Sequence, residues 1–367
     1  MIEIIAYIAF GFLLIRMGVG LLNLLTSTGL KEGKPDVLPP VTILIPARNE
    51  EQNLPFLIRQ IDSLDYPDFE VMVYDDESTD GTLKMLEDAA KNYKWLSVIK
   101  GIGLPEGWIG KNYACHRLAE KAEGEYLLFL DADVHIEPSV LKDTLSSMKK
   151  SKVELLSVFP QQMMGSFGEW LTVPVMNQIL VSLLPLYLVR NSSWKDFAAA
   201  NGQFMLFRGD NYRKHRYHEL FRDDPVEDIR IMREMKRLGY PVKTYLSNGQ
   251  VSCRMYRSFN EAVTGFSKNV IEFFGGRLVL ILLYLFLTNF GFVFILLGLP
   301  LYSLMVYLGL SLILKGVTSW VSRQKILPNL LLLPLQQISL NIVVFSAISK
   351  RLSGYMRWKG RNIRIGS

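Results

Sequence analysis

Residues 126–133 read YLLFLDAD, a short apolar run that ends in two aspartates separated by one residue. Such β-rich runs alternate with stretches of helical period along the chain. The runs are residues 41–45, 71–74 and 126–130, and the helical stretches are residues 50–64, 82–90 and 114–122. This alternation predicts βαβ units, and therefore an α/β domain with a mostly parallel sheet covered by helices on both faces.

Loops at the carboxyl ends of parallel strands are where such sheets bind ligands. Three of the predicted strands end in polar loops, which read PARNE at 46–50, DDESTDG at 75–81 and DAD at 131–133. Asp131 and Asp133 reach the sheet edge together, and two carboxylates can hold a hard divalent cation that bridges phosphates. The sequence therefore predicts Mg²⁺ or Mn²⁺ at this pair. The acids of the 75–81 loop are equally consistent with a simple helix start.

The apolar residues are too numerous for an ordinary soluble protein, because 49% of the chain is hydrophobic and only 21% is charged. They are concentrated in long uncharged runs. We expect an N-terminal transmembrane anchor in residues 1–30, a cytosolic domain in residues 40–260 and C-terminal membrane helices in residues 277–349. The run 278–314 would extend about 55 Å as one helix, so it is predicted to fold back near Gly298 and Pro300.

Charges near these runs predict the orientation of the chain. Glu3 precedes the first run and Lys31 and Lys34 follow it, which favours a cytosolic position for the next domain of a multi-pass cell-membrane protein. The tail 350–367 carries six basic residues and no acid, which is typical of a membrane surface rather than of a nucleic-acid partner. With only Cys115 and Cys253, no disulfide framework is expected.

Two apolar segments are interrupted by polar residues or prolines. Residues 326–349 are predicted to form either a third helix inside a bundle or a re-entrant hairpin, because their amides are costly against lipid. Residues 168–190 contain Pro174 and Pro185, and they lie between groups that must act on one side of the membrane. We therefore expect a helix in the membrane interface there, beside which a lipid reaches the site.

Five segments, in order and spacing, resemble family 2 glycosyltransferases with the GT-A fold, over about residues 40–260. They are IPARNE at 45–50, the 75–81 loop, Gly110-Lys111-x-x-Ala114, Gly124-Glu125 ahead of 131–133, and Val226-Glu227-Asp228. Within that family, residues 105–108, 254–256 and 358–361 are similar to membrane-bound enzymes that glycosylate carotenoids and related terpenoid lipids.

This resemblance implies a GT-A (Rossmann-like) sheet and a nucleotide-sugar donor, in particular a UDP-sugar. It implies that base and ribose are held by Pro46, Ala47, Arg48, Asn49, Glu50 and Asp76. It places Lys111 beside the nucleotide, Asp131 at ribose or phosphate, and Asp133 at the metal. Asp228 would be the catalytic base with Glu227 beside it, although both also suit the acidic first turn of a helix. Arg254 and Arg257 are predicted either to bind the diphosphate or to lie at the membrane surface.

The expected function is inverting transfer of a single sugar, glucose, from the donor to a membrane lipid acceptor such as a carotenoid or other terpenoid. Two departures concern the acceptor side. Some members have Gly-Gly-His where this chain has residues 216–218, RYH, and processive polysaccharide synthases have Gln-x-x-Arg-Trp where residues 254–258 read RMYRS. The missing tryptophan disfavours a processive synthase. A non-catalytic nucleotide-sugar-binding membrane protein is disfavoured because every expected acid is present.

Overall fold

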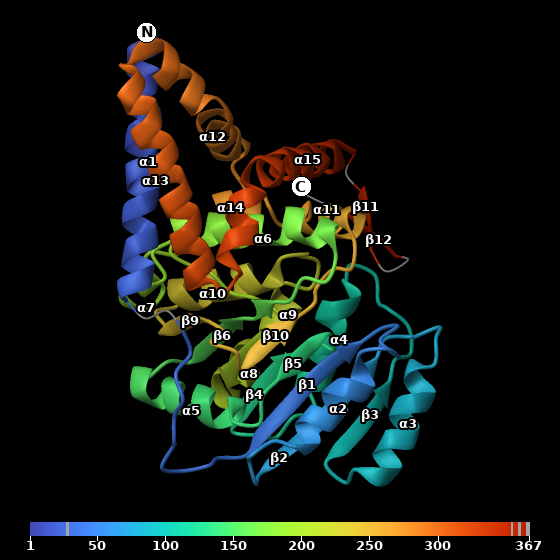
Figure 1. Ribbon diagram of the computed structural model, residues 1–367. Coiled ribbons are helices and arrows are strands. Elements are labelled where there is room, and N and C mark those ends of the chain that lie inside the picture. The colour runs from blue at the N-terminus through green and yellow to red at the C-terminus, as the bar shows by residue number, and fades with distance from the viewer. Residues whose placement is uncertain (27–28, 354, 359–360, 365–367) are drawn as a thin grey trace.

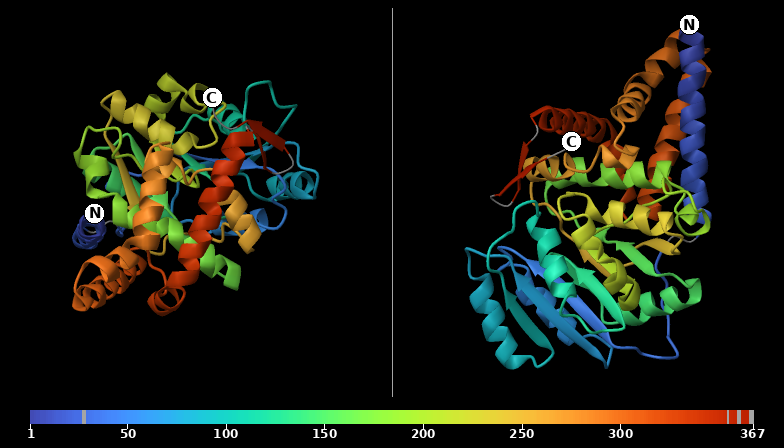
Figure 2. Two further views of the ribbon diagram at one scale, coloured as in Figure 1. Left: turned by 90° about the horizontal axis from the view of Figure 1, so that it is seen from above. Right: turned by 180° about the vertical axis from the view of Figure 1, so that it is seen from behind.

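A computed structural model describes residues 1–26, 29–353, 355–358 and 361–364 of the chain. The chain forms an α/β domain from which a rod of long helices rises, with a layer of helices between them that lies crosswise to the rod (Figure 1). The N-terminus is at the far end of the rod. Figure 2 shows the same arrangement from above and from behind.

The main sheet has the strand order β3-β2-β1-β4-β8-β6-β9. Its strands are β1 (Val41–Ala47), β2 (Phe69–Asp75), β3 (Leu96–Lys100), β4 (Tyr126–Leu130), β6 (Leu155–Phe159), β8 (Phe204–Arg208) and β9 (Val242–Leu246). Neighbouring strands run parallel except β8, which is antiparallel to both β4 and β6. The predicted α/β class and mostly parallel sheet are thus confirmed.

Helices cover both faces of this sheet because successive side chains of a strand point to opposite faces. In β1, Ile43 and Ile45 pack with α2 and α5 in one apolar cluster, whereas Leu44 packs with α4 and α10 in another. The domain helices are α2 (Leu54–Asp62), α3 (Thr82–Asn92), α4 (Gly110–Ala119), α5 (Val140–Ser151), α8 (Gly209–His215), α9 (Tyr217–Leu220) and α10 (Glu227–Arg237). Helix α2 begins later than residue 50 because residues 48–53 form a loop at the sheet edge.

A small second sheet extends this edge. It consists of β5 (Val134–Ile136), β10 (Val251–Cys253) and β7 (Gln161–Gln162). Strand β10 pairs with β5 and with β7. Because β5 follows Asp133 directly, this pairing brings the residues after β10 close to the end of β4.

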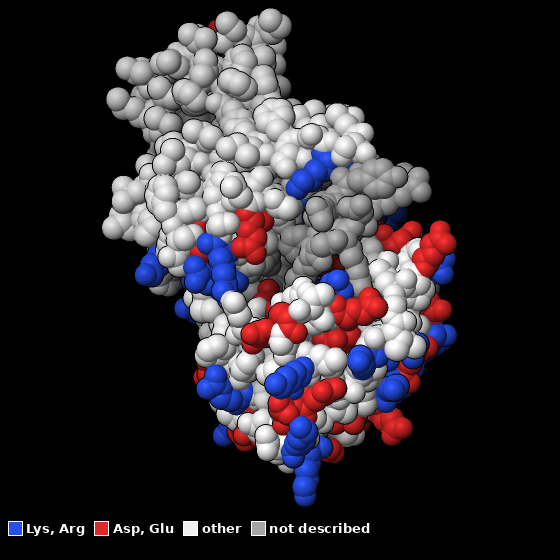
Figure 3. All heavy atoms as spheres, turned by 90° about the vertical axis from the view of Figure 1, so that its right-hand side faces the viewer, with Lys and Arg blue, Asp and Glu red and all other residues white. Residues whose placement is uncertain are grey.

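Of the described residues, three helices are long and apolar enough to cross a membrane, namely α1 (Ile2–Leu25), α12 (Leu278–Gly298) and α13 (Leu301–Val321). The chain reverses at Leu299 and Pro300, as predicted. A side chain at Gly298 would meet the backbone of Glu3, so the start of α1 packs against this reversal. In Figure 3 the charged side chains gather over the α/β domain, whereas the rod carries almost none.

The crosswise layer contains α6 (Phe167–Leu183), α7 (Tyr187–Asn191), α11 (Phe259–Phe266), η1 (Glu272–Phe274), α14 (Ile326–Leu331) and α15 (Leu333–Ser353). Residues 326–349 were predicted to form either a third helix in a bundle or a re-entrant hairpin. They form α14 and then α15, and α15 lies on α6 (Figures 1 and 2). Their amides bond within the protein: Gln336 Nε2 donates to the Trp170 carbonyl and Asn329 Nδ2 to Ser319. Protein partners therefore replace the lipid contacts that would be costly.

Polar side chains of the rod hold α6 in place. Arg16 of α1 donates to Ser182 Oγ at 3.2 Å, and Lys315 of α13 donates to Gln178 Oε1 at 2.7 Å. Asn23 of α1 binds the Val181 carbonyl at 2.8 Å. Helix α6 is continuous through Pro174, and it contacts α15, α11, α1 and α13, while Leu180 and Val181 join an apolar cluster of the α/β domain. Its position in a membrane interface stays a prediction.

The predicted basic tail is described only in part. Lys350 binds Ser267 and the Thr264 carbonyl, and Arg351 binds the Gly276 carbonyl. These two residues thus attach the end of α15 to α11 and to the segment that leads from α11 to α12. The backbone continues as the hairpin of β11 (Tyr355–Trp358) and β12 (Arg361–Arg364). The side chains of the other basic residues in the tail lie outside the described residues.

Candidate active site

Two cavities adjoin at the carboxyl ends of β1, β2 and β4. The strand-side cavity, about 560 Å³, is lined by the loops after these strands and by residues 104–114. The helix-side cavity, about 710 Å³, is lined by α6, the start of α10 and the segments around α11. Both cavities are lined by the same junction residues, which are Glu50, Lys111, Asp131, Asp133, Pro225, Glu227 and Lys268.

The loops after β1 and β2 hold each other at the strand-side cavity. The Arg48 guanidinium donates to the Asp76 carbonyl and lies 4.0 Å from its carboxylate. Asn49, at a φ of 55°, accepts a 2.8 Å hydrogen bond from Thr79 N–H. The predicted nucleoside residues Pro46, Ala47, Arg48, Glu50 and Asp76 all line this cavity, whereas Asn49 lines the helix-side cavity; their role in binding a nucleoside stays a prediction.

For the acids of the 75–81 loop the sequence left two roles open, at a ligand-binding edge or at a helix start, and the structure places Asp76 and Asp80 differently. Asp80 accepts hydrogen bonds from the Thr82 N–H at 3.0 Å and from the Thr82 hydroxyl at 2.6 Å, at the start of α3. This is the helix-start role. Asp76 instead lies in the wall of the strand-side cavity, where only 6% of it is exposed.

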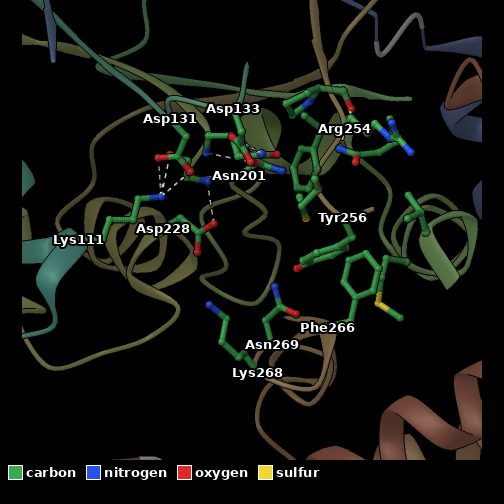
Figure 4. Close-up of a pocket in the computed structure, with 18 of the residues that line it drawn as sticks. Lys111, Asp131, Asp133, Asn201, Asp228, Arg254, Tyr256, Phe266, Lys268 and Asn269 are labelled. Atoms are coloured by element: carbon green, nitrogen blue, oxygen red, sulfur yellow. Dashed lines mark hydrogen bonds and ion pairs between the residues drawn. The ribbon is translucent and has the colours of Figure 1, made fainter. Parts of the chain in front are cut away.

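Lys111, in the first turn of α4, is the central cation of the junction. Its Nζ lies 2.9 Å from both carboxylate oxygens of Asp131 and 3.6 Å from Glu227 Oε1 (Figure 4). Burial alone would lower the pKa of Lys111, but Asp131 and Glu227 hold it well above its usual value. Lys111 therefore stays charged and partly neutralises two acids.

Glu227 and Asp228 begin α10 and face different groups. Glu227 lies beside Lys111, whereas Asp228 lines only the helix-side cavity. The Asp228 carboxylate accepts 2.8 Å hydrogen bonds from the Gly202 and Ile229 N–H groups, which fix its orientation. Burial raises the pKa of both acids, although Lys111 opposes the shift. A carboxylate with a raised pKa is a stronger base than an exposed one.

Asp133 fits a divalent cation that takes most of its ligands from a bound phosphate. Among the described residues no three His, Cys, Asp or Glu side chains form a metal site. Mg²⁺ at phosphate sites commonly uses one or two carboxylates together with phosphate and water. Because Asp131 holds Lys111 through both oxygens, the geometry favours Asp133 as the protein ligand. Gln203 Nε2 donates to Asp133 Oδ1 at 3.2 Å, and its buried Oε1 has no hydrogen-bond partner among the described residues.

Sequence reasoning did not find the segment of Asn201, Gly202 and Gln203. Because β8 is antiparallel to β4 and Phe204 pairs with Leu130, the residues before β8 lie beside those after β4. A Cβ at Gly202 would lie 3.1 Å from Lys111 Nζ and 3.2 Å from Glu227 Oε1. The absence of a side chain thus lets the loop approach the junction.

Lys268 and Asn269 are two further residues that the motifs did not indicate. They follow α11 and lie across the helix-side cavity from Asp228, on the opposite side from Asp131 and Asp133 (Figure 4). Lys268 also lines the strand-side cavity. Lys268 is therefore a second cation at the junction, in addition to Lys111.

Arg254 and Arg257 both line the helix-side cavity, and neither lines the strand-side cavity. Arg254 makes a two-pronged contact with Glu169 of α6, at 2.8 and 3.1 Å, and no part of Glu169 is exposed. Burial raises the pKa of Glu169, but hydrogen bonds from Arg254 and from the Gly165 N–H outweigh it and lower the pKa to about 2. Arg257 contacts Gln52 at 2.9 Å on the surface.

We expect Arg254→Ala to destabilise the protein by about 3 kcal/mol, because it leaves the Glu169 carboxylate buried and unpaired. The matched substitution Arg257→Ala should cost about 1 kcal/mol or less, because its partners are exposed. Thermal unfolding in detergent measures both. Equal losses for the two variants would show that Arg254 is not a structural ion pair.

Comparisons with known proteins agree with this geometry. Residues 42–216 match the model of the family described as Glycosyl transferase family 2. The 4,4'-diaponeurosporenoate glycosyltransferase of Staphylococcus haemolyticus is 26% identical over 244 residues, which is 65% of this chain and 63% of that protein. The Beta-monoglucosyldiacylglycerol synthase of Nostoc sp. is 32% identical over 123 residues, 33% of this chain and 26% of that protein. The match thus spans less than two thirds of either relative.

The fold also resembles solved structures. A mannosyltransferase from Pyrobaculum calidifontis, PcManGT, solved in complex with GDP-Man and Mn²⁺, superposes with a TM-score of 0.61 at 17% identity. The superposition covers 96% of this chain and 99% of that one. The predicted GT-A fold is confirmed, and the likeness extends to the helices outside the sheet domain.

Proposed function

Residues 42–216 form a glycosyl transferase family 2 domain, and from this premise we propose that the protein transfers one sugar from a nucleotide donor to a membrane lipid. The observation that carries the proposal is the junction of two cavities at one cluster of acids and lysines. The strand-side cavity would hold the nucleotide, and the helix-side cavity would hold the acceptor. The reacting sugar would lie where they meet.

The donor is a UDP-sugar, with UDP-glucose as the first candidate, on the resemblance to lipid glucosyltransferases. Arg48 and Asp76, which hold the two loops together, would position the base and ribose. Lys111 would lie beside the phosphates and keep Asp131 and Glu227 from repelling them. Asp133 would hold Mg²⁺ or Mn²⁺, which when bound supplies positive charge to a departing diphosphate.

The chemistry is a single displacement with inversion at the anomeric carbon. The acceptor hydroxyl oxygen forms a bond to that carbon while the bond from the carbon to the diphosphate oxygen breaks. Asp228 takes the hydroxyl proton, and the bond electrons leave with the diphosphate. The Gly202 and Ile229 N–H groups keep the Asp228 carboxylate aimed into the helix-side cavity.

Membrane helices beside the helix-side cavity support a lipid as the acceptor. Helix α6 lines this cavity and contacts both α1 and α13. If α1, α12 and α13 all cross, the sheet domain and the end of α15 lie on the same side, and the positive-inside rule makes that side the cytosol. A carotenoid or other terpenoid is the first acceptor candidate, since the Staphylococcus relative is named for a carotenoid acid.

Lys268→Met is expected to lower the turnover by about 10², because a cation at the junction can stabilise the charge that develops on the leaving diphosphate. Lys268→Arg should recover part of the rate, and the exposed Lys91→Met should have no effect. Initial rates at saturating donor measure all three. Normal turnover of Lys268→Met would move this role to Arg254 or Arg257.

The function is tested by incubating membranes that contain the protein with labelled nucleotide sugars and chromatographing the extracted lipids. We expect label from UDP-glucose in one new lipid. Its anomeric configuration, determined by NMR, should be opposite to that of the donor. A product with the donor's configuration would contradict the single displacement.

A further inference from the structure

A groove of about 640 Å³ continues from the helix-side cavity along α10. The two spaces are both lined by Phe159, Leu180, Ala200, Ile229 and Phe273. Ile229 follows Asp228 directly, so the inner end of the groove lies next to the proposed base. The groove is therefore a second way into the acceptor side of the site.

One wall of the groove is apolar and is formed by the end of α6, by η1 and by the start of α12. It is formed by Ile179, Leu183 and Leu184 of the α6 end, Phe274 of η1 and Leu280 of α12. Leu280 is in the first turn of α12, and 42% of it is exposed. The α6 end is bound to the spanning helices through its bonds to α1 and α13. The outer end of the groove thus lies where α12 leaves the domain.

The other wall is charged, with an excess of basic residues. The basic residues are Lys195, Arg230, Arg233, Arg237 and Arg277, and the acidic ones are Asp196, Glu234 and Glu272. Glu272 is shared by Arg230 and Arg233, at 3.5 and 3.4 Å. An excess of positive charge beside an apolar surface is attracted to the anionic head groups of a cytoplasmic leaflet.

An exposed aromatic residue directly precedes the basic wall in the sequence. Trp194 precedes Lys195, is 71% exposed and stacks on Phe197 with ring centroids 6.1 Å apart. Exposed tryptophans are enriched at the level of lipid head groups. The basic wall, the exposed tryptophan and the start of α12 together indicate that the outer end of the groove opens at the membrane surface.

We propose that this groove holds the apolar chain of the acceptor lipid while the hydroxyl of the same molecule reaches Asp228. The proposal rests on the proposed function and adds the substrate class: a long-chain amphiphile with its hydroxyl at the polar end. The chain runs between the apolar α6 wall and Phe273 and leaves at Leu280 into the bilayer. The acceptor therefore reacts without leaving the membrane.

The kinetic test compares two substitutions of leucine by tryptophan. Leu183 lines the groove, whereas Leu282 is 46% exposed on α12 and does not line it. Leu183→Trp should raise the KM for a long-chain acceptor about tenfold and leave the KM for a short-chain, water-soluble analogue unchanged, because only the chain site is narrowed. Leu282→Trp should change neither value. An equal effect of Leu183→Trp on both acceptors, or no effect, would overturn the proposal.

A second readout does not depend on turnover. A sixteen-carbon alcohol with a diazirine in its chain is photolysed with the full-length protein in vesicles, and the labelled peptides are mapped by mass spectrometry. We expect label on the ends of α6 and α10, lost in Leu183→Trp and kept in Leu282→Trp. Labelling confined to the outer faces of α1, α12 and α13 would overturn the proposal that the groove holds the lipid chain. Absence of sugar transfer by the wild type would instead count against the proposed function.

Discussion

Asp228→Asn is expected to lower the transfer rate by about 10² or more while donor affinity stays nearly unchanged. An amide keeps the shape of the carboxylate but cannot take the proton of the acceptor hydroxyl. Asp228 lines only the helix-side cavity, so the nucleotide contacts in the strand-side cavity remain. Donor affinity is measured by calorimetry beside the initial rate of transfer.

Asp88→Asn is the matched control, because Asp88 is exposed on α3 and pairs with Lys91 at the surface. It should retain the wild-type rate. Normal turnover of Asp228→Asn would assign the base elsewhere, with Glu227 as the next candidate. Loss of donor affinity together with rate would mean that Asp228 contributes to the donor site.

Asp133→Ala is the second substitution with a large expected effect, and it should weaken donor binding and abolish most turnover together. Without a cation, the diphosphate would lie against Asp131 and Asp133 with only the lysines to offset the repulsion. Excess chelator should likewise weaken donor binding and turnover of the wild type, and added Mn²⁺ or Mg²⁺ should restore both. Calorimetry with and without metal gives a readout that does not require turnover.

Full activity of the wild type in excess chelator would contradict this prediction. It would leave Lys111 and Lys268 as the groups that neutralise the diphosphate. Asp133→Ala would then be expected to affect local contacts such as the hydrogen bond from Gln203, without a large loss of turnover.

Much of the α/β domain was predictable because the sequence patterns that indicate its strands and helices are each contained in a short segment of the chain. An apolar run followed by polar residues locates a strand end, and parallel strands bring such ends to one edge. The loops that contain Pro46 and Asp76 were located at the ligand-binding edge in this way. The reversal between α12 and α13 followed from length alone, since one uncharged helix there would be nearly twice as long as the bilayer core is thick.

Residues contributed by distant pairing were not predictable. Gly202 and Gln203 reach the site because β8 runs antiparallel to β4, and nothing in residues 204–208 indicates that direction. Arg254 follows β10 and finds its partner Glu169 in helix α6, far away in the sequence, so its role as an ion pair depends on tertiary structure. The same holds for α15, because Gln336 is acceptable there only through its bonds to Trp170 and Asn329.

The most direct test of the account uses the purified full-length protein in phospholipid vesicles that contain long-chain acceptor lipids. UDP-glucose labelled in the sugar is added with Mn²⁺, and the label is followed into the organic phase. The wild type should move label into a lipid with a single added sugar, and Asp228→Asn should not. Label that stays in the aqueous phase as free sugar, or that appears in a polymer, would contradict it.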